Sequence, residues 1–277
     1  MLGEVERKLT ALVLPPMAEE AKQPFRVATP EEFRRFRDLG YEDFRRLAAD
    51  PSLTTNERIG FPDRYREGFE DAIFADLVAK LPGLNERGLQ VLDIGPGCGP
   101  LPHLLLELCR DHGHRLIWVD SPEMLDQLPD GPDVTKVPGP YPQATSAMPL
   151  DAACDIVLAY GVFPCVFKDG DGWAFLDAVL SHLASGGAAL IGDIPNISKR
   201  RRFLSSPAGH AFHTAVTGDE SAPDVAFNKL EPGTIDDGVL LGMLTRARAG
   251  GYDAYIVPQA PGLPMANRRE DLLVTAP

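Results

Sequence analysis

The chain has 277 residues, of which 44% are hydrophobic and 24% are charged, and its formal net charge is -13 at pH 7. These proportions are ordinary for a folded globular protein and are not those of a disordered chain. The negative charge argues against a nucleic-acid-binding protein, because affinity for a phosphate backbone comes from Lys and Arg. A chain of this length can bury a substantial core, as one large domain or as one domain with an appendage.

The start of the chain and its cysteines indicate a cytoplasmic protein. The segment before Pro15 and Pro16 has neither the basic start nor the long apolar core of a secretory signal. No run approaches 18 apolar residues, so we expect no membrane span. The cysteines are scattered without a C-x-x-C pair, which favours buried thiols over a metal site or a disulfide framework. They are Cys98, Cys109, Cys154 and Cys165.

The first 85 residues predict helices. Thr29 to Glu32 supply an N-cap, a proline in the first turn and an acid at the capping-box position, and an apolar stripe at helical spacing follows. A second helix is predicted from about Asp63 to Leu81, where Pro82 and Gly83 end it. We therefore expect residues 1–85 to form a helical N-terminal cap or lid.

From Leu89 onward, short apolar runs alternate with amphipathic helical stretches. This alternation is typical of an α/β fold, in which helices cover both faces of a parallel sheet. The predicted strands are Gln90–Ile94, Arg115–Asp120, Asp155–Ala159 and Ala188–Gly192, followed near the end by a closing pair, Tyr252–Val257 and Asp271–Thr275. The predicted helices carry Leu101 to Leu108, Leu176 to Leu183 and Leu240 to Leu244.

Residues 195–235 interrupt this alternation. They contain the basic run Lys199 to Arg202, two histidines and several prolines, but little periodicity. We interpret them as an insertion that lies over the carboxyl edge of the sheet.

The segment from Val91 to Gly99 reads VLDIGPGCG and lies where a predicted strand turns into a helix. Glycines suit such a loop because its backbone turns tightly and approaches a ligand closely. Free N–H groups at the start of a helix favour a negatively charged ligand group, and open α/β sheets bind ligands at the carboxyl ends of their strands. We therefore expect a nucleotide-type cofactor at the loop from Asp93 to Gly99.

The spacing of the glycines indicates which class of nucleotide cofactor the loop binds. A dinucleotide fingerprint needs G-x-G-x-x-G, but its third position here is Pro100, and a P-loop needs a Gly-Lys-Ser/Thr that is missing. The glycines instead alternate as G-x-G-x-G, with Asp93 two residues before the first. This segment closely resembles the first motif of the class I S-adenosylmethionine-dependent methyltransferase family.

The resemblance covers roughly residues 85–277 apart from the insertion. It implies a Rossmann-like methyltransferase sheet that is mostly parallel with an antiparallel last strand, in a domain spanning 86–277 with an insertion at about 195–235. It also implies S-adenosyl-L-methionine as the cofactor. In the family this loop holds the methionyl part of the cofactor, so the implied cofactor residues are Asp93, Gly95, Pro96, Gly97 and Gly99.

Asp120 ends the second predicted strand, 21 residues beyond Gly99. A carboxylate at this position can accept two hydrogen bonds from ribose hydroxyls, whereas a solvated strand-end residue is the alternative interpretation. The glycine loop favours ribose binding. Ser121 begins a turn that resembles the family's turn after this acid, so it is a further candidate for cofactor binding.

Tyr160 and Gly161 end a strand that resembles the family's fourth motif, and they would border the reactive methyl group. The pattern Asn/Asp-Pro-Pro-Tyr/Phe, which is found in many enzymes that methylate planar amines, is absent there. Its absence argues against a planar amine as the acceptor. The family's adenine-contacting acid is also missing upstream. Tyr141 or Gln143 is therefore expected to contact adenine.

Residues past the strand ends and in the insertion are the candidates for catalysis. An oxygen acceptor needs a base, and the candidates for it are His210 and His213 of the insertion, although an isolated histidine is more often structural. Asp193 and Asn196 follow a strand and could orient hydroxyls, with an Asx-turn role equally open.

Charged and aromatic residues elsewhere are candidates for binding the acceptor. Arg200 lies in the basic run, which could pair with a phosphate or carboxylate or be a solvated face. Tyr65 could lie on the helical lid, and Asn267 and Arg268 precede the final strand and could return a charged group toward the site.

Together these observations predict an S-adenosylmethionine-dependent methyltransferase that methylates oxygen on a small hydroxylated molecule, such as a sugar derivative. The alternatives are a non-catalytic S-adenosylmethionine-binding scaffold or sensor, and a methyltransferase for a nitrogen or carbon acceptor. We expect no nucleic-acid partner, membrane or metal, and homodimerisation is left open.

Overall fold

The computed structural model describes residues 35–36, 39–147, 153–170, 172–229 and 231–277. The helix predicted to begin at Thr29 lies outside these residues. Among them, no helix is both long and apolar enough to cross a membrane. The four cysteines are free thiols, and all but Cys165 are buried.

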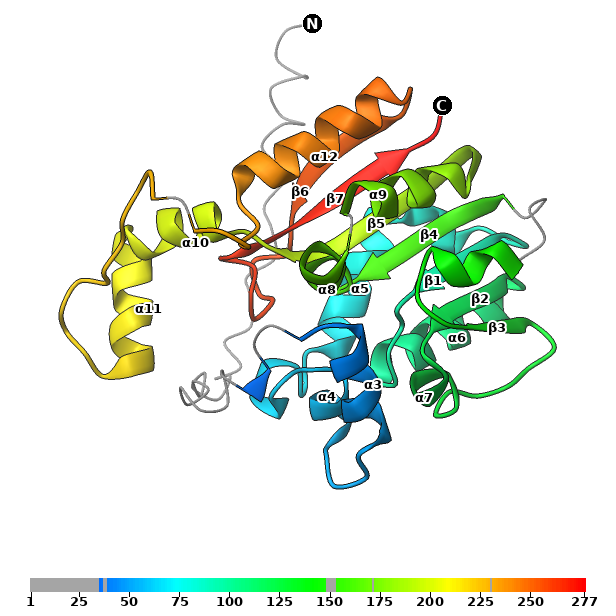
Figure 1. Cartoon of the computed structure of the whole chain (residues 1–277), viewed down its shortest axis with the longest axis horizontal. Coiled ribbons are helices and arrows are strands. Elements are labelled where there is room, and N and C mark those ends of the chain that lie inside the picture. The colour runs from blue at the N-terminus through cyan, green and yellow to red at the C-terminus, as the bar shows by residue number, and fades with distance from the viewer. Residues whose placement is uncertain (1–34, 37–38, 148–152, 171, 230) are drawn as a thin grey trace, which may run out of the picture.

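A single sheet of seven strands forms the centre of the molecule, with the order β3-β2-β1-β4-β5-β7-β6 (Figure 1). β1 to β5 pair in parallel, whereas β7 is antiparallel to both of its neighbours, β5 and β6. The predicted α/β class and the antiparallel last strand are confirmed. The strands are β1 (Gln90–Ile94), β2 (Arg115–Asp120), β3 (Val134–Pro138), β4 (Cys154–Tyr160), β5 (Leu183–Pro195), β6 (Asp253–Pro258) and β7 (Arg269–Thr275).

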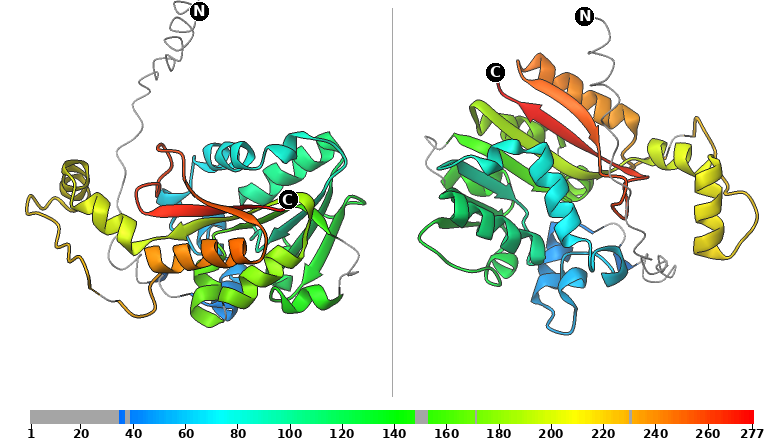
Figure 2. Two further views of the ribbon diagram at one scale, coloured as in Figure 1. Left: turned by 90° about the horizontal axis from the view of Figure 1, so that it is seen from above. Right: turned by 180° about the vertical axis from the view of Figure 1, so that it is seen from behind.

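Helices cover both faces of this sheet, as Figure 2 shows. α5 (Glu70–Lys80) and α6 (Pro100–His112) bury apolar side chains with Val91 on one face. α9 (Gly172–Ser181) and α12 (Asp237–Ala249) do so with Leu92 on the other. Because adjacent strand residues point to opposite faces, a strand buried on both reads as a continuous apolar run.

The N-terminal elements pack at the carboxyl edge of the sheet. They are α3 (Tyr41–Ala49), α4 (Thr55–Arg58) and the short 3-10 helix η1 (Asp63–Tyr65), and α3 contacts α7 (Pro122–Leu125) and α8 (Phe163–Asp169). The helix predicted over 63–81 is interrupted, because Gly68 has a φ of +79° and α5 begins only after it.

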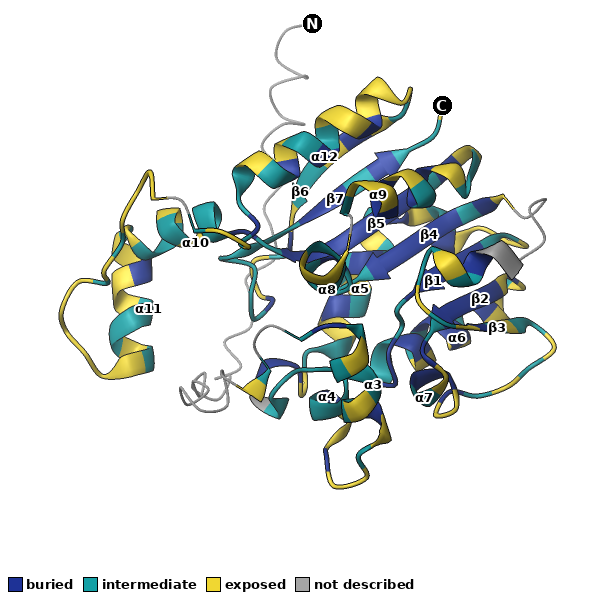
Figure 3. Ribbon diagram, in the orientation of Figure 1, coloured by how far each residue is buried: buried dark blue, intermediate teal, exposed yellow. Residues whose placement is uncertain are grey.

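Two helices form within the segment predicted as an insertion, although its sequence shows little periodicity. α10 (Ile197–Leu204) is capped by Asn196, and α11 (Pro207–Thr217) is capped by Ser206. These helices project away from the sheet instead of lying over its edge (Figures 1 and 2). α10 buries no residue and α11 buries only Gly209, which explains the weak periodicity of their sequence (Figure 3). We refer to α10 and α11 as the arm.

Candidate functional site

A cavity of about 330 Å³ lies at the carboxyl ends of β1, β2 and β4. Its walls come from several regions of the chain, among them α8 and α9. The glycine loop contributes Gly95, Pro96, Gly97 and Gly99, and the end of β4 contributes Tyr160 and Gly161. Asp120 and the loop Gly139 to Gln143 form another side, and the N-terminal cap contributes Tyr41, Phe44, Asn56, Ile59, Phe61 and Arg66.

The glycine loop takes a conformation that side chains other than glycine rarely adopt. Gly95 and Gly97 have φ angles of +65° and +68°. A Cβ on Gly97 would lie only 2.8 Å from Cγ2 of Ile59, so the cap packs directly on this loop. The loop conformation is therefore restricted both by its own turn and by Ile59 at the end of α4.

Asp120 presents a carboxylate to the cavity. Its Oδ2 accepts a hydrogen bond from the Gly97 N–H at 2.9 Å, and its Oδ1 accepts one from the Ser121 N–H at 2.6 Å. Burial raises the pKa of Asp120 to about 6, although these two N–H groups work against the rise. A carboxylate has about four lone-pair sites, so it can accept two further hydrogen bonds.

Two of the predicted cofactor residues support the cavity without lining it. Asp93 is buried beneath the loop, where burial and the charge of Asp120 raise its pKa to about 8. Ser121 is buried and caps α7, with its Oγ accepting from the Met124 N–H. Ser121 therefore supports the site through the turn after β2, whose backbone it caps.

The loop after β3 forms the wall opposite the glycine loop. Tyr141 and Gln143 both line the cavity. The Tyr141 hydroxyl lies 3.0 Å from Nδ1 of His182, and its ring meets Phe175 edge-on with the centroids 5.5 Å apart. Burial raises the pKa of Tyr141. Its phenol is thus fixed by neighbours while part of the residue faces the cavity.

Arg66 closes the cavity toward β5. Its Nη2 lies 3.0 Å from Oδ2 of Asp193, and its guanidinium carbon lies 4.2 Å from the centre of the Phe61 ring and 5.4 Å from that of Tyr160. Both partners of this ion pair are buried. Arg66 lines the cavity, whereas Asp193 does not.

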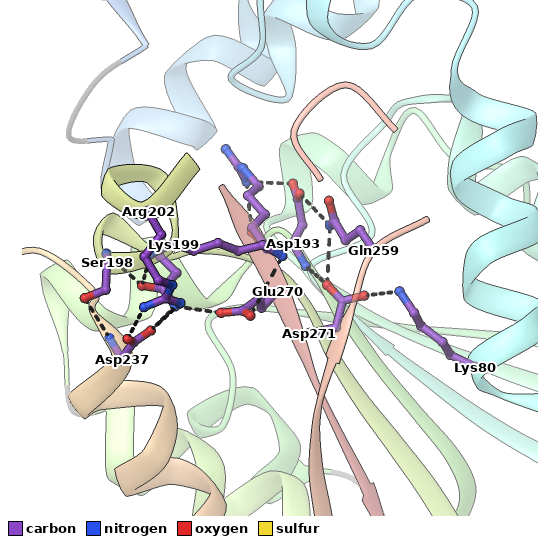
Figure 4. Close-up of polar contacts among 11 residues, drawn as sticks. Lys80, Asp193, Ser198, Lys199, Arg202, Asp237, Gln259, Glu270 and Asp271 are labelled. Carbon is purple, nitrogen blue, oxygen red and sulfur yellow. Dashed lines mark hydrogen bonds and ion pairs between the residues drawn. The ribbon is translucent and has the colours of Figure 1, made fainter. Parts of the chain in front are cut away.

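Asp193 belongs to a buried polar network behind this wall (Figure 4). Its Oδ2 also pairs with Nη1 of Arg269 at 2.7 Å, and its Oδ1 accepts from Nε2 of Gln259 at 3.1 Å. The network continues through Asp271, which accepts from the Asp193 N–H and pairs with Lys80 at 2.6 Å. Asp193 is a candidate for catalysis from the sequence, but these partners engage its carboxylate and favour a structural role for it.

Asn196 likewise serves the fold. Its Oδ1 accepts from the first N–H groups of α10, and its Nδ2 donates to Asp237 at 2.7 Å and to Glu270 at 2.6 Å. The Asx-type interpretation of this residue therefore has structural support. In the basic run, acidic partners are found for three residues, Lys199, Arg201 and Arg202.

The other predicted acceptor and base residues lie outside the cavity lining. His210 and His213 are on α11, and Nε2 of His210 lies 3.1 Å from the Glu220 carbonyl. Tyr65 is buried behind Arg66, beside Asp193. Arg200 is exposed on α10, while Arg268 and Asn267 precede β7. The structure places Arg200, Arg268 and Tyr65 near one another but not on the cavity wall.

The sequence predicts a cap but does not indicate which of its side chains contact the glycine loop and β5. Ile59 and Arg66 reach the glycine loop and β5 from segments far away in the sequence, and no local motif marks them. In the part of the chain that the structure describes, no group of His, Cys, Asp and Glu side chains is arranged to hold a metal.

No family model matches the chain, and no curated protein matches it by sequence. Solved structures, however, resemble its fold. The plantazolicin methyltransferase BamL, in complex with a triazolic desmethylPZN analog and SAH, has a TM-score of 0.55 and 13% identity over 88% of this chain and 96% of that chain. The N-methyltransferase NodS from Bradyrhizobium japonicum WM9, in complex with S-adenosyl-L-homocysteine, has a TM-score of 0.52 and 14% identity over 86% and 98%.

A third solved structure is the putative methyltransferase in complex with the Haloferax volcanii Trm112 methyltransferase activator. Its TM-score is 0.50 at 18% identity, over 85% of this chain and 98% of that chain. At these identities the likeness concerns the fold. The chain has the Rossmann-like fold of the class I methyltransferases, as the resemblance of its glycine loop predicts.

Proposed function

We propose that the protein is an S-adenosylmethionine-dependent methyltransferase that methylates oxygen on a small hydroxylated molecule. The observation that carries the proposal is the cavity itself, where the glycine loop, Asp120 and Gly161 converge at the carboxyl ends of three parallel strands. Ligands of open α/β sheets bind at this edge.

The residues around the cavity fit the cofactor. Asp120 retains acceptor capacity for the two ribose hydroxyls, and the positive φ angles of Gly95 and Gly97 let the backbone approach the ligand closely. Tyr141 and Gln143 are placed to flank the adenine. We assign the guanidinium of Arg66 to the carboxylate of the methionyl group, because it is the arginine on the cavity wall.

When bound, the cofactor supplies a methyl group activated by a positively charged sulfur. The chain contributes chiefly by position, because it must hold the acceptor atom in line behind that methyl group. The cap supports a small acceptor. Tyr41, Phe44 and Ile59 cover the cavity, whereas a protein acceptor would need an open groove.

The experiment measures cofactor binding and turnover separately. Isothermal titration with S-adenosylhomocysteine tests the cofactor site, with NAD as the matched control, and binding of NAD alone would exclude the proposal. Turnover is then followed as S-adenosylhomocysteine released with panels of sugars, sugar phosphates, amines and phenols. Mass analysis must locate the new methyl group on oxygen. A methyl group on nitrogen or carbon would overturn the acceptor assignment, and binding without any turnover would favour a non-catalytic protein.

A further inference from the structure

A second polar site lies between the arm and the residues before β7. Five buried side-chain atoms lack a hydrogen-bond partner among the described residues, and three of them are consecutive: Oδ1 of Asn267, Nε of Arg268 and Nε of Arg269. Buried polar groups are nearly always satisfied, so such a concentration indicates a group that the described residues do not supply.

Arg268 is the centre of this site. Its guanidinium carbon lies 5.8 Å from the centre of the Phe212 ring of α11, so the side chain is stacked against the arm. No carboxylate of the described residues is within ion-pair distance of it. Burial lowers the pKa of Arg268 to about 10, with smaller contributions from the positive charges of Arg200 and Arg269 and an opposing one from Tyr65. Arg268 is partly exposed, but its Nε is buried without a hydrogen-bond partner, which is costly for the fold.

The neighbouring charges are also positive. Arg200, on α10, is the one member of the basic run for which the described residues offer no acidic partner. Arg269 is engaged by Asp193, which Arg66 shares. Asp193 is thus shared by Arg66 and Arg269, whereas no ion pair with a described residue is found for Arg200 or Arg268, in a chain whose net charge is -13. This local excess of positive charge attracts anions.

We propose that Arg200 and Arg268 bind an oxyanion, a phosphate or a carboxylate, that is carried by the methyl acceptor. Guanidinium groups match oxyanions by bidentate hydrogen bonds, and the guanidinium carbon of Arg268 lies over the Phe212 ring of the arm. The site is linked to the cavity by the chain of contacts from Arg269 through Asp193 to Arg66. It is thus separate from the methionyl end of the cofactor.

Only the assignment of the anion to the acceptor rests on the proposed function. Binding of the anion itself does not require methyl transfer. An acceptor whose anionic group is held beside the arm would extend from there toward the cavity, which gives the arm a role in choosing among hydroxylated molecules.

The test is isothermal titration of the full chain with inorganic phosphate, glucose 1-phosphate and glucose at constant ionic strength. We expect saturable binding of inorganic phosphate and tighter binding of glucose 1-phosphate. Arg268→Gln and Arg200→Gln should each weaken both by at least about tenfold. Arg115→Gln, which removes an exposed arginine at the start of β2, is the matched control and should leave both affinities unchanged.

The variants distinguish the possible failures. Arg200 is exposed, so its variant should fold even if Arg268→Gln does not. Equal affinity for phosphate and glucose 1-phosphate would assign the site to free phosphate and overturn its link to the acceptor. Unchanged phosphate binding in Arg200→Gln, or no binding to the unmodified chain, would overturn the site. S-adenosylhomocysteine affinity should stay unchanged in both arginine variants, so a failed cofactor site would be seen independently.

Discussion

Arg66 and Asp193 join the N-terminal cap to the end of β5, with Nη2 and Oδ2 3.0 Å apart and side-chain exposures of only 8% and 7%. Asp193 has a φ of +60°, an uncommon conformation for a residue with a side chain. Since Arg269 binds the same carboxylate, one acidic group fixes both the wall of the cavity and the start of β7. The position of the cap over the cofactor site therefore depends on a residue that does not line it.

Replacing Asp193 with Asn should strongly destabilise the protein. Asn tolerates the left-handed backbone but leaves two buried guanidinium groups without their anion, so we expect a loss of about 3 kcal/mol in the free energy of unfolding. Urea denaturation measures it. Asp177→Asn is the control, because its ion pair with Arg246 is about half exposed and should contribute less than about 1 kcal/mol. Equal losses in the two variants would contradict a buried, stabilising network.

Removing the carboxylate of Asp120 should weaken the cofactor site. In Asp120→Ala, the loss of two ribose hydrogen bonds to a charged group should reduce S-adenosylhomocysteine binding by roughly 2 to 4 kcal/mol. Isothermal titration gives the affinity, and Asp126→Ala, at the exposed end of α7, is the control. An affinity within twofold of the unmodified protein would mean that Asp120 is not the ribose ligand.

Cofactor affinity should also fall in acid. The pKa of Asp120 is raised to about 6 in the ligand-free protein, so below this pH the carboxylate takes up a proton that ribose binding must displace. We expect affinity to fall by up to about tenfold per pH unit between pH 6 and pH 5. Titrations of Asp120→Asn over the same range provide the comparison and should be flatter. Parallel profiles would assign the pH dependence to another group.

The free energy of unfolding should fall as the pH rises, because of Asp93. Its pKa in the folded chain is about 8, above its ordinary value, so the folded state holds a proton that the unfolded state releases. The free energy of unfolding therefore falls as pH rises from about 4 to about 8. Asp93→Asn cannot ionise, so the ligand-free variant should gain stability relative to the unmodified protein by up to about 1 kcal/mol per pH unit over this window. Urea denaturation at pH 5 and pH 8 tests this, and a constant difference would refute it.

Gly97→Ala should disturb the loop in two separable ways. The new methyl group would meet Ile59 at 2.8 Å, and the positive φ angle would strain any residue with a side chain. We expect a loss of about 1 to 3 kcal/mol of stability together with weaker cofactor binding. Adding Ile59→Ala should relieve the collision but not the backbone strain, so part of the binding should return. If the double variant binds no better than Gly97→Ala, the cap does not press on the loop.

The sequence predicts the centre of this fold better than its margins, for a physical reason. β1, β2 and β4 are buried on both faces and show as apolar runs, whereas β3 was not predicted because Val137 is its one buried residue. The arm escaped prediction because its helices bury too little to impose a period.

In the candidate site, too, only the part formed by a contiguous segment could be predicted from the sequence. The glycine loop is contiguous, so its spacing indicates its chemistry. Arg66 and Asp193 are 127 residues apart, and their pairing depends on the finished fold. His210 and His213 are candidate bases because of their residue type alone. Neither lines the cavity, so a base role for them stays a prediction without support from its lining.

The place of β7 between β5 and β6 has a consequence for synthesis on the ribosome. Both neighbours leave the ribosome before residues 269–275 do, so β5 keeps an open hydrogen-bonding edge until the intervening strand arrives. Open edges invite pairing with other chains. The same late strand carries Arg269 and Asp271, the partners of Asp193 and Lys80, so the buried polar network forms only after this strand arrives. A nascent chain halted before residue 269 should therefore depend most on chaperones.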